Sequence, residues 1–234
     1  MCTRFVYNGK ETIIGFNFEI DLADWTYKII REKDIFAIGI LMPDHQYHTF
    51  HGINKNGNVG TLLYVHGNEK GKYSTKHNTI TIACLTEDFI KGKITLDDAL
   101  YIVQNQKITY AKDATMQAML SDQLGRVLIV EPGIGYRMVQ QRYTVMTNDS
   151  LLKPEITRQY HVNGDDRFEK TQAQLERQND NFSMIDAMNI LKSVKQDGLW
   201  ATRVSFVCSV KEKKVFYVKD NQFDKMMTYQ LKRS

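Results

Sequence analysis

Residues 1–19, MCTRFVYNGKETIIGFNFE, hold the pattern from which the fold can be read. Residues 3–7 are rich enough in aromatic and β-branched side chains to form a strand. Asn8-Gly9 then gives a strong hairpin-turn signal, and residues 12–19 have the length and pattern of a return strand. The sequence therefore predicts an antiparallel hairpin at its start, whose second strand ends level with the second residue of the chain.

Cys2 becomes the N-terminal residue once Met1 is removed, and a small residue at the second position permits that removal. A terminal cysteine carries a thiol and an α-amine, whose unperturbed pKa values are about 8.5 and roughly 7.7–8.0. One residue can then supply both the nucleophile and the general base that activates it, close to neutral pH. The alternative is that Cys2 is only a small residue tolerated at the start of a strand.

The composition is that of a soluble globular protein, with 42% hydrophobic and 25% charged residues in a chain of 234. A chain of this length can bury a full core, and we expect one domain over residues 1–234. The net charge of +4 is too small to indicate a nucleic-acid partner. The sequence shows neither an apolar run of 18 residues nor a charged leader with a cleavage site, so we expect no membrane association and a cytoplasmic location.

The cysteines and histidines give no pattern typical of a metal site. Three cysteines at wide spacing argue against a disulfide framework or a metal cluster. Cys84 and Cys208 lie in apolar runs, so we expect both to be buried and inert. His45, His48 and His51 recur at every third position, whereas side chains on one face of a strand recur at every second. We expect surface and turn histidines here, and no metal.

The rest of the chain divides into blocks of strands and blocks of helices. Strand patterns cover residues 35–42, 46–50 and 59–65, most of 116–147, and three segments between 202 and 231. Helix patterns follow Thr95 and Ser183 and cover 165–179, and residues 78–92 fit either structure. Segregated blocks predict an α+β fold with layered antiparallel sheets. Motifs for dinucleotides, phosphate loops, zinc proteases and nucleophile elbows are missing from the sequence, which therefore predicts no cofactor.

Six short motifs follow one another along most of the chain. They are Met1-Cys2-Thr3, Gly15-Phe16-Asn17-Phe18-Glu19, Gly52-Ile53-Asn54-Lys55-Asn56-Gly57, Ser121-Asp122-Gln123-Leu124-Gly125 with Val130-Glu131, Val145-Met146-Thr147-Asn148 and Gly164-Asp165-Asp166-Arg167-Phe168. In this order and at these spacings they resemble the choloylglycine hydrolase family. That family consists of linear-amide C–N hydrolases of the N-terminal-nucleophile type, including bile salt hydrolases and penicillin V acylases. The resemblance implies a four-layer αββα sandwich of two antiparallel sheets, which fits the block order.

The resemblance also implies a role for several side chains. Cys2 is the nucleophile, with its own α-amine as the base. Asn148 donates its side-chain amide to the oxyanion, and a backbone N–H near Leu63 or Tyr64 is the second donor, as acyl transfer requires. Arg167 lies near Cys2 and lowers the pKa of its thiol by its positive charge.

The sequence departs from the family pattern at two positions of the hairpin strand. Phe16 stands where the family has an arginine, which removes a positive charge from the site. Glu19 stands where the family has an aspartate that holds the α-amine by a hydrogen bond. Asp21 is one alternation further along the strand, on the same face as Glu19, and could partly substitute for it.

The resemblance predicts a hydrolase that cleaves a small-molecule N-acyl amide through an acyl-enzyme. Two alternatives use the same residues: a catalytically silent relative that binds an acylated ligand, which the loss of the arginine at Phe16 favours, and an acyltransferase in which an amine resolves the acyl-enzyme. Bile salt hydrolases carry a longer insertion where this chain has only Asp149 to Asp166, and that insertion packs their tetramers. We therefore expect a monomer or a differently built dimer.

Overall fold

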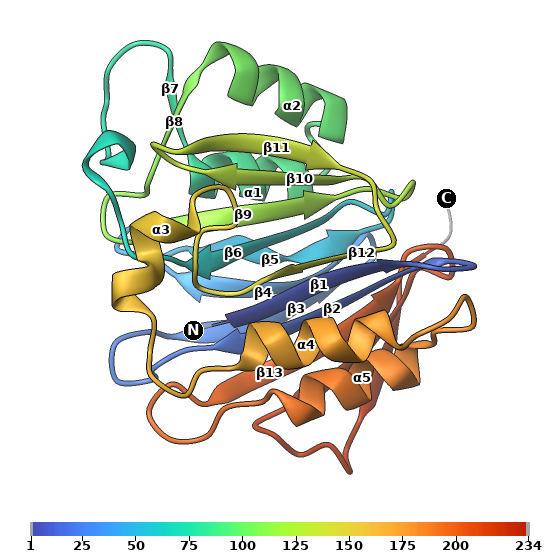
Figure 1. The fold of residues 1–234 in the computed structure, drawn as a ribbon. Coiled ribbons are helices and arrows are strands. Elements are labelled where there is room, and N and C mark those ends of the chain that lie inside the picture. The colour runs from blue at the N-terminus through green and yellow to red at the C-terminus, as the bar shows by residue number, and fades with distance from the viewer. Residues whose placement is uncertain (1, 233–234) are drawn as a thin grey trace.

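The computed structural model describes residues 2–232 and has four layers, with two β-sheets packed face to face between two layers of helices (Figure 1). Within each of the two large sheets, every neighbouring pair of strands is antiparallel. The predicted α+β class and the αββα sandwich are confirmed.

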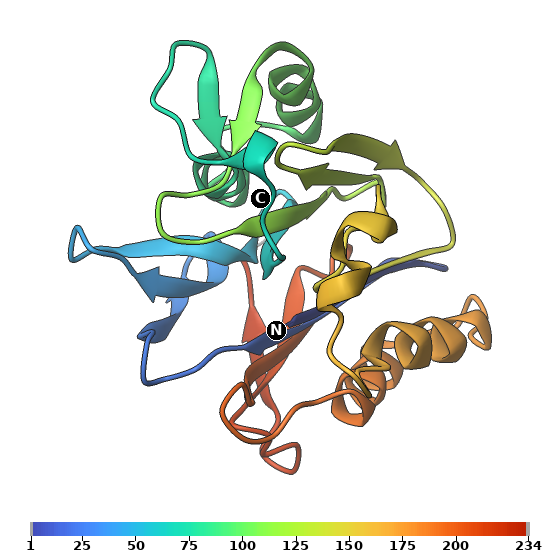
Figure 2. The ribbon, with the colours of Figure 1, turned by 60° about the vertical axis from the view of Figure 1, so that its left-hand side comes forward.

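The six-stranded sheet contains the N-terminal hairpin. Its order is β12 (Tyr143–Met146), β1 (Cys2–Asn8), β2 (Thr12–Glu19), β13 (Thr202–Ser209), β14 (Lys214–Lys219) and β15 (Met227–Gln230). Strands β1 and β2 pair from Cys2 opposite Phe18 to Asn8 opposite Thr12, so the predicted hairpin is confirmed. The outer face of this sheet carries α4 (Arg167–Glu176) and α5 (Met184–Ser193) (Figures 1 and 2). The central strands β1 and β2 are therefore covered on both faces, which explains their nearly continuous burial.

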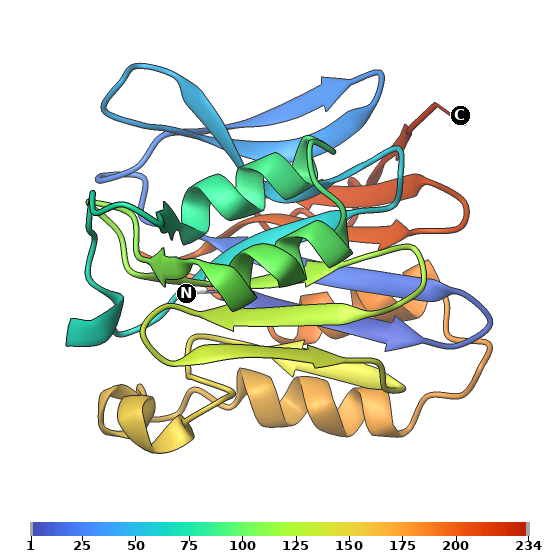
Figure 3. The ribbon, with the colours of Figure 1, turned by 90° about the horizontal axis from the view of Figure 1, so that it is seen from above.

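The seven-stranded sheet faces it. Its order is β11 (Gly135–Val139), β10 (Val127–Glu131), β9 (Met116–Ser121), β6 (Val59–Tyr64), β5 (Tyr47–Asn54), β4 (Ile35–Leu41) and β3 (Tyr27–Glu32). Helices α1 (Ile82–Ile90) and α2 (Leu96–Asn105) lie across its outer face (Figure 3). A short parallel pair, β7 (Thr79–Thr81) and β8 (Lys107–Thr109), brackets these two helices.

Local signals explain where several helices begin. Thr95 and Ser183 each cap a helix with a reciprocal capping box, as the sequence predicts. The ambiguous stretch 78–92 contains both structures, because Thr81 ends β7 and its side chain also caps α1. A short helix, α3 (Pro154–Thr157), and a 3-10 turn at Arg158–Tyr160 lie in the segment between β12 and α4. A second 3-10 turn covers Glu69–Gly71.

Two expectations about burial were wrong. Cys84 is exposed, because it lies on the solvent side of α1 while its apolar neighbours face the sheet. His51 is buried, because it projects from β5 into the layer between the sheets. Cys208 is buried as predicted, and burial raises the pKa of its thiol to about 12. Among residues 2–232, no helix is long and apolar enough to span a membrane.

Arg4 is a fully buried cation in the layer between the sheets. Its guanidinium donates to the Thr61 hydroxyl (3.2 Å), the Ser121 hydroxyl (2.9 Å) and the Phe5 carbonyl (2.7 Å), all of them uncharged acceptors. Burial lowers the pKa of Arg4 to about 9. Arg4 therefore ties the first strand to the seven-stranded sheet through neutral groups.

Candidate active site

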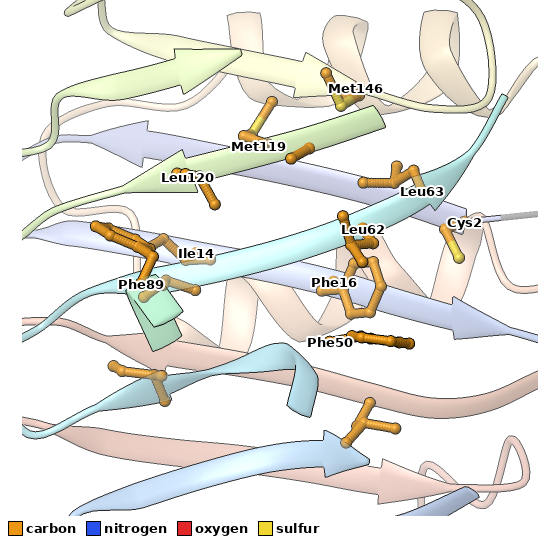
Figure 4. Close-up of a cluster of buried hydrophobic side chains, with 14 of the residues drawn as sticks. Cys2, Ile14, Phe16, Phe50, Leu62, Leu63, Phe89, Met119, Leu120 and Met146 are labelled. Carbon is orange, nitrogen blue, oxygen red and sulfur yellow. The ribbon is translucent and has the colours of Figure 1, made fainter. Parts of the chain in front are cut away.

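The site forms where β1 begins. Cys2 is buried and pairs with Phe18 across the hairpin, and its thiol points toward the Glu19 carbonyl at 4.0 Å. Figure 4 shows Cys2 at one end of the cluster of apolar side chains between the sheets. Burial raises the pKa of the Cys2 thiol, and the negative charge of Glu19 adds to the rise, while Arg167 only partly opposes it. The predicted lowering of this pKa by Arg167 is thus outweighed by burial.

Asn148 follows the end of β12 and links Cys2 to the facing sheet. Its Oδ1 accepts the backbone N–H of Cys2 at 2.8 Å and Nη2 of Arg167 at 3.1 Å. Its Nδ2 donates to the Tyr64 carbonyl at 2.6 Å. Two donors on one side and a carbonyl on the other fix which way the amide is oriented. Asn148 is therefore held between Cys2 and Tyr64.

Arg167 is the first residue of α4, and its side chain is 5% exposed. Nη1 donates to Glu19 (2.9 Å), to the Cys2 carbonyl (3.1 Å) and to the Thr3 hydroxyl (3.3 Å). Nε and Nη2 bind the two carboxylate oxygens of Asp165 at 2.7 and 2.6 Å. The sequence motif therefore brings Arg167 to Cys2, as predicted, but with two carboxylates already bound to it.

This group of side chains, which we call the charge cluster (Glu19, Asp165 and Arg167), has one negative charge in excess when both acids are ionised. Arg167 binds Asp165 through two hydrogen bonds and holds the pKa of that carboxyl below its usual value, although burial opposes this. Burial raises the pKa of Glu19 to about 7, against the attraction of Arg167 and a hydrogen bond from the Thr202 hydroxyl at 3.0 Å. The excess charge is therefore relieved by proton uptake at Glu19 near neutral pH.

Tyr64 presents its backbone to the site. The Val65 N–H bonds to the Thr115 carbonyl, just before β9, and hydrogen-bonding directions alternate along an antiparallel strand. The backbone N–H and carbonyl of Leu63 therefore point toward β9. Those of Tyr64 point away from β9, to the side where Asn148 donates to the Tyr64 carbonyl. Of the two predicted backbone donors, the geometry favours Tyr64.

His51 explains why the end of β6 has no backbone hydrogen bonds to β5. Backbone pairing between β5 and β6 covers Thr61 to Val59 only. The next N–H on this side, that of Leu62, donates to Nδ1 of the His51 ring at 3.2 Å instead of to a carbonyl. Burial lowers the pKa of His51 to about 3, so the ring is neutral and can accept. The last residues of β6 therefore leave β5 and turn toward Asn148.

Phe16 and Asp21 lie apart from the charge cluster. Phe16 is fully buried and stacks on the His51 ring, with centroids 4.9 Å apart, so an aromatic pair occupies the position where the resemblance implies an arginine. The carboxylate of Asp21 accepts the N–H of Ala23 at 2.9 Å and caps the turn after β2. Arg4 does not restore the missing charge, because its guanidinium lies near Ser121, which pairs with the opposite end of β6 from Tyr64.

The sequence did not reveal Asp165, Thr202 and Gln117 as residues of the site. Asp165 lies two positions before Arg167 inside one of the six motifs. A carboxylate so close to an expected cation could have indicated that the two side chains form an ion pair. Thr202 and Gln117 give no such signal, because they reach the site only through strand pairing and sheet packing. In the described part of the chain, no three His, Cys, Asp or Glu side chains are grouped so that they could hold a metal ion.

A small cavity of about 100 Å³ opens beside Asn148 and Tyr64, and the segment from Asp149 to Asp165 covers it. Its further lining includes His66 and Tyr160, whose rings stack on each other. Figures 1 and 2 both show this segment, with α3, beside the start of β1. The cavity is large enough for only a small part of a substrate.

Comparison with known proteins shows similarity in structure only. No family model matches the sequence, and no curated protein matches it either. Among solved structures, a cysteine-to-alanine mutant of the conjugated bile acid hydrolase from Clostridium perfringens is similar, with a TM-score of 0.69, 13% identity and coverage of 98% of this chain and 92% of that one.

Two further structures resemble the chain. The penicillin V acylase from Agrobacterium tumefaciens has a TM-score of 0.68 and 17% identity, over 94% of this chain and 83% of that one. The Caenorhabditis elegans ortholog of N-acylethanolamine-hydrolyzing acid amidase has a TM-score of 0.59 and 15% identity, over 99% and 100%. These comparisons agree with the resemblance seen in the sequence motifs, and the chain has the fold of the choloylglycine hydrolase-like N-terminal-nucleophile hydrolases.

Proposed function

We propose that this protein is a hydrolase of linear N-acyl amides in which Cys2, after removal of Met1, is the nucleophile. The observation that carries the proposal is the position of the Cys2 nitrogen, 2.8 Å from Oδ1 of Asn148 and beside a cluster with excess negative charge. When the α-amine takes the thiol proton, the α-ammonium that forms would find an acceptor here and would balance that charge. In a chain that retains Met1, the Cys2 nitrogen is a peptide nitrogen, which can donate to Asn148 but carries no charge.

The mechanism follows from the two groups of the terminal cysteine. Because burial raises the pKa of the thiol, little thiolate forms unless a base takes the proton. In the processed chain the α-amine of Cys2 takes it as the sulfur attacks the substrate carbonyl. The α-ammonium then returns that proton to the leaving amine, and the acyl group remains on the sulfur as a thioester. Water, activated by the same amine, hydrolyses the thioester and restores the thiol.

As the Cys2 sulfur attacks, negative charge develops on the oxygen of the substrate carbonyl, and this oxygen needs hydrogen-bond donors. The amide nitrogen of Asn148 and the backbone N–H of Tyr64 lie at the same edge of the site, because Nδ2 of Asn148 contacts the Tyr64 carbonyl. We propose these two as the oxyanion donors. Arg167 and Glu19 then hold the Cys2 backbone and its amine in place.

The substrate class is proposed from what the similar structures share. Their names give a conjugated bile acid, penicillin V and N-acylethanolamines, which differ in both acyl group and amine. A linear amide C–N bond is common to all three, so the proposal is limited to a small-molecule N-acyl amide. The free cysteines favour a reducing compartment, and we propose the cytoplasm.

Intact mass of the purified protein, before and after incubation with a panel of N-acyl amides, tests the proposal. The expected result is a chain without Met1, turnover of at least one amide, and an acyl adduct that is absent in Cys2→Ala. Turnover that Cys2→Ala retains would refute the role of Cys2. Hydroxylamine that raises product formation above hydrolysis, through a hydroxamate, would indicate acyl transfer to amines.

A silent binding protein is the second candidate, and Phe16 in place of the family's arginine favours it. It predicts saturable binding of an acyl amide to the processed chain, without an adduct and without product. Calorimetric titration in parallel with the mass measurement separates this outcome from catalysis.

A further inference from the structure

Gln117 is a fully buried side chain on β9 that reaches across the gap between the sheets. Its Nε2 donates to the carbonyls of Thr147 (2.9 Å) and Asp149 (3.0 Å), the residues on either side of Asn148. Two carbonyl acceptors require the nitrogen of the amide at this position, so chemistry fixes the orientation of the side chain. One glutamine therefore holds the backbone on both sides of Asn148.

These carbonyls need a partner from outside the β-ladder. Strand β12 ends at Met146, and from Thr147 onward the chain leaves the six-stranded sheet. Buried carbonyls that lose their strand partner cost free energy unless another donor replaces it. With both carbonyls held by Gln117, the side chain of Asn148 is directed to the opposite side, toward Cys2 and Tyr64.

The two proposed oxyanion donors come from different sheets. Tyr64 belongs to β6 of the seven-stranded sheet, and Asn148 follows β12 of the six-stranded sheet. Gln117 pairs with Leu63, next to Tyr64, so its backbone moves with one donor while its amide holds the other. Gln117 thus ties the backbone on both sides of Asn148 to the seven-stranded sheet, and it acts together with the direct hydrogen bond from the Asn148 amide to the Tyr64 carbonyl.

The oxygen of the same Gln117 amide, unlike its nitrogen, makes no hydrogen bond in the described part of the chain. Among the described residues, Oε1 of Gln117 is buried and has no hydrogen-bond partner. An unsatisfied buried acceptor lowers the stability of the folded state. Such groups are rare in native structures and often accompany a functional constraint.

We propose that Gln117 is a positioning residue for catalysis, which keeps the Asn148 amide and the Tyr64 N–H at the spacing that an oxyanion requires. The inference rests on the proposed amide hydrolysis and goes beyond it in naming what sets the geometry of the oxyanion donors. The proposed role of Gln117 affects one property of the enzyme and leaves another unchanged. The reactivity of the Cys2 thiol does not depend on Gln117, whereas attack on a carbonyl does.

The test compares Gln117→Met, which has a similar volume and no donor, with the wild-type protein. We expect acylation and kcat to fall by roughly 10- to 100-fold, the cost of a misplacement of about 1 Å. KM and the rate of Cys2 alkylation by iodoacetamide should stay within about twofold of wild type, since an oxyanion donor acts on the transition state. Gln140→Met is the matched control, because Gln140 is exposed and donates to the distant Leu124 carbonyl.

Gln117→Glu keeps the length of the side chain and guards against a methionine variant that does not fold. Burial against two carbonyls should keep the new acid protonated, so that it donates one hydrogen bond in place of two. We expect acylation faster than in Gln117→Met and slower than in wild type.

The inference is overturned if either variant acylates at the wild-type rate, or if acylation and thiol alkylation fall by the same factor. Wild-type protein that neither acylates nor turns over any amide would instead overturn the proposed hydrolase, whatever the variants do. The two failures are therefore distinguishable.

Discussion

Glu19→Gln tests the charge cluster directly through the pH dependence of stability. The pKa of Glu19 rises from an ordinary 4.5 to about 7 in the folded chain, mainly because the carboxyl is buried. The folded state therefore binds this proton more tightly than the unfolded state does. Stability is highest below pH 4.5 as far as this group is concerned, and it falls as pH rises to 7.

The size of the effect follows from the two pKa values. At about 1.4 kcal/mol per pH unit, the interval from 4.5 to about 7 corresponds to roughly 3 kcal/mol of unfolding free energy. Glutamine at position 19 can still accept from Arg167 but cannot ionise. We expect the wild-type chain to lose roughly 3 kcal/mol more than Glu19→Gln between about pH 4.5 and 7.5.

Urea denaturation at a series of pH values measures this difference, on protein that retains Met1 because methionine aminopeptidase is inhibited during expression. Other titrating groups act in both proteins and cancel in the comparison. Glu169→Gln, an exposed carboxyl on α4, is the control and should follow the wild-type curve. Parallel curves for wild type and Glu19→Gln would show that Glu19 ionises as easily in the fold as in the unfolded chain, and would refute the account of the cluster.

Four further outcomes are expected. Asn148→Ala should lower turnover by roughly 10²–10³ while thiol alkylation persists, the usual cost of one oxyanion donor; turnover near the wild-type rate would contradict that role. Protein that retains Met1 should still be alkylated at Cys2 but should lose amide turnover, because a peptide nitrogen is not basic; unchanged turnover in kinetic assays would exclude the terminal amine as the base. Arg4→Met should leave the unfolding free energy unchanged or raise it by up to about 3 kcal/mol, since a buried cation with neutral partners is replaced by an apolar side chain; a measurable loss of unfolding free energy in denaturation would contradict this. Light scattering should show a monomer or a dimer, and a tetramer with residues 151–162 buried between subunits would refute the prediction.

The fold was largely predictable because its signals are local. The Asn8-Gly9 turn and the capping boxes of Thr95 and Ser183 are each contained within a few residues, and each predicted element is present. Strand β3 was not predicted, because Tyr27–Glu32 is an edge strand with charged and exposed positions that weaken its pattern.

The site was predictable where a motif carried it and not where packing did. The structure brings Cys2, Glu19, Asn148 and Arg167 together, as the motifs suggested, although their catalytic roles stay a proposal. The raised pKa of the Cys2 thiol was not predictable, because it depends on how deeply the facing sheet buries the sulfur. The same holds for His51, whose burial depends on the direction in which β5 faces.

The excess negative charge around Arg167 has a practical consequence for making the protein. A purification tag fused directly before Cys2 would replace the terminal amine by an amide, next to the buried Glu19 and the partly buried Asp165 carboxylates. Such a preparation would lack the base and would also be less stable at neutral pH than in mild acid. Screens for substrates that use an N-terminally tagged chain would then return nothing, for reasons unrelated to which amide was offered.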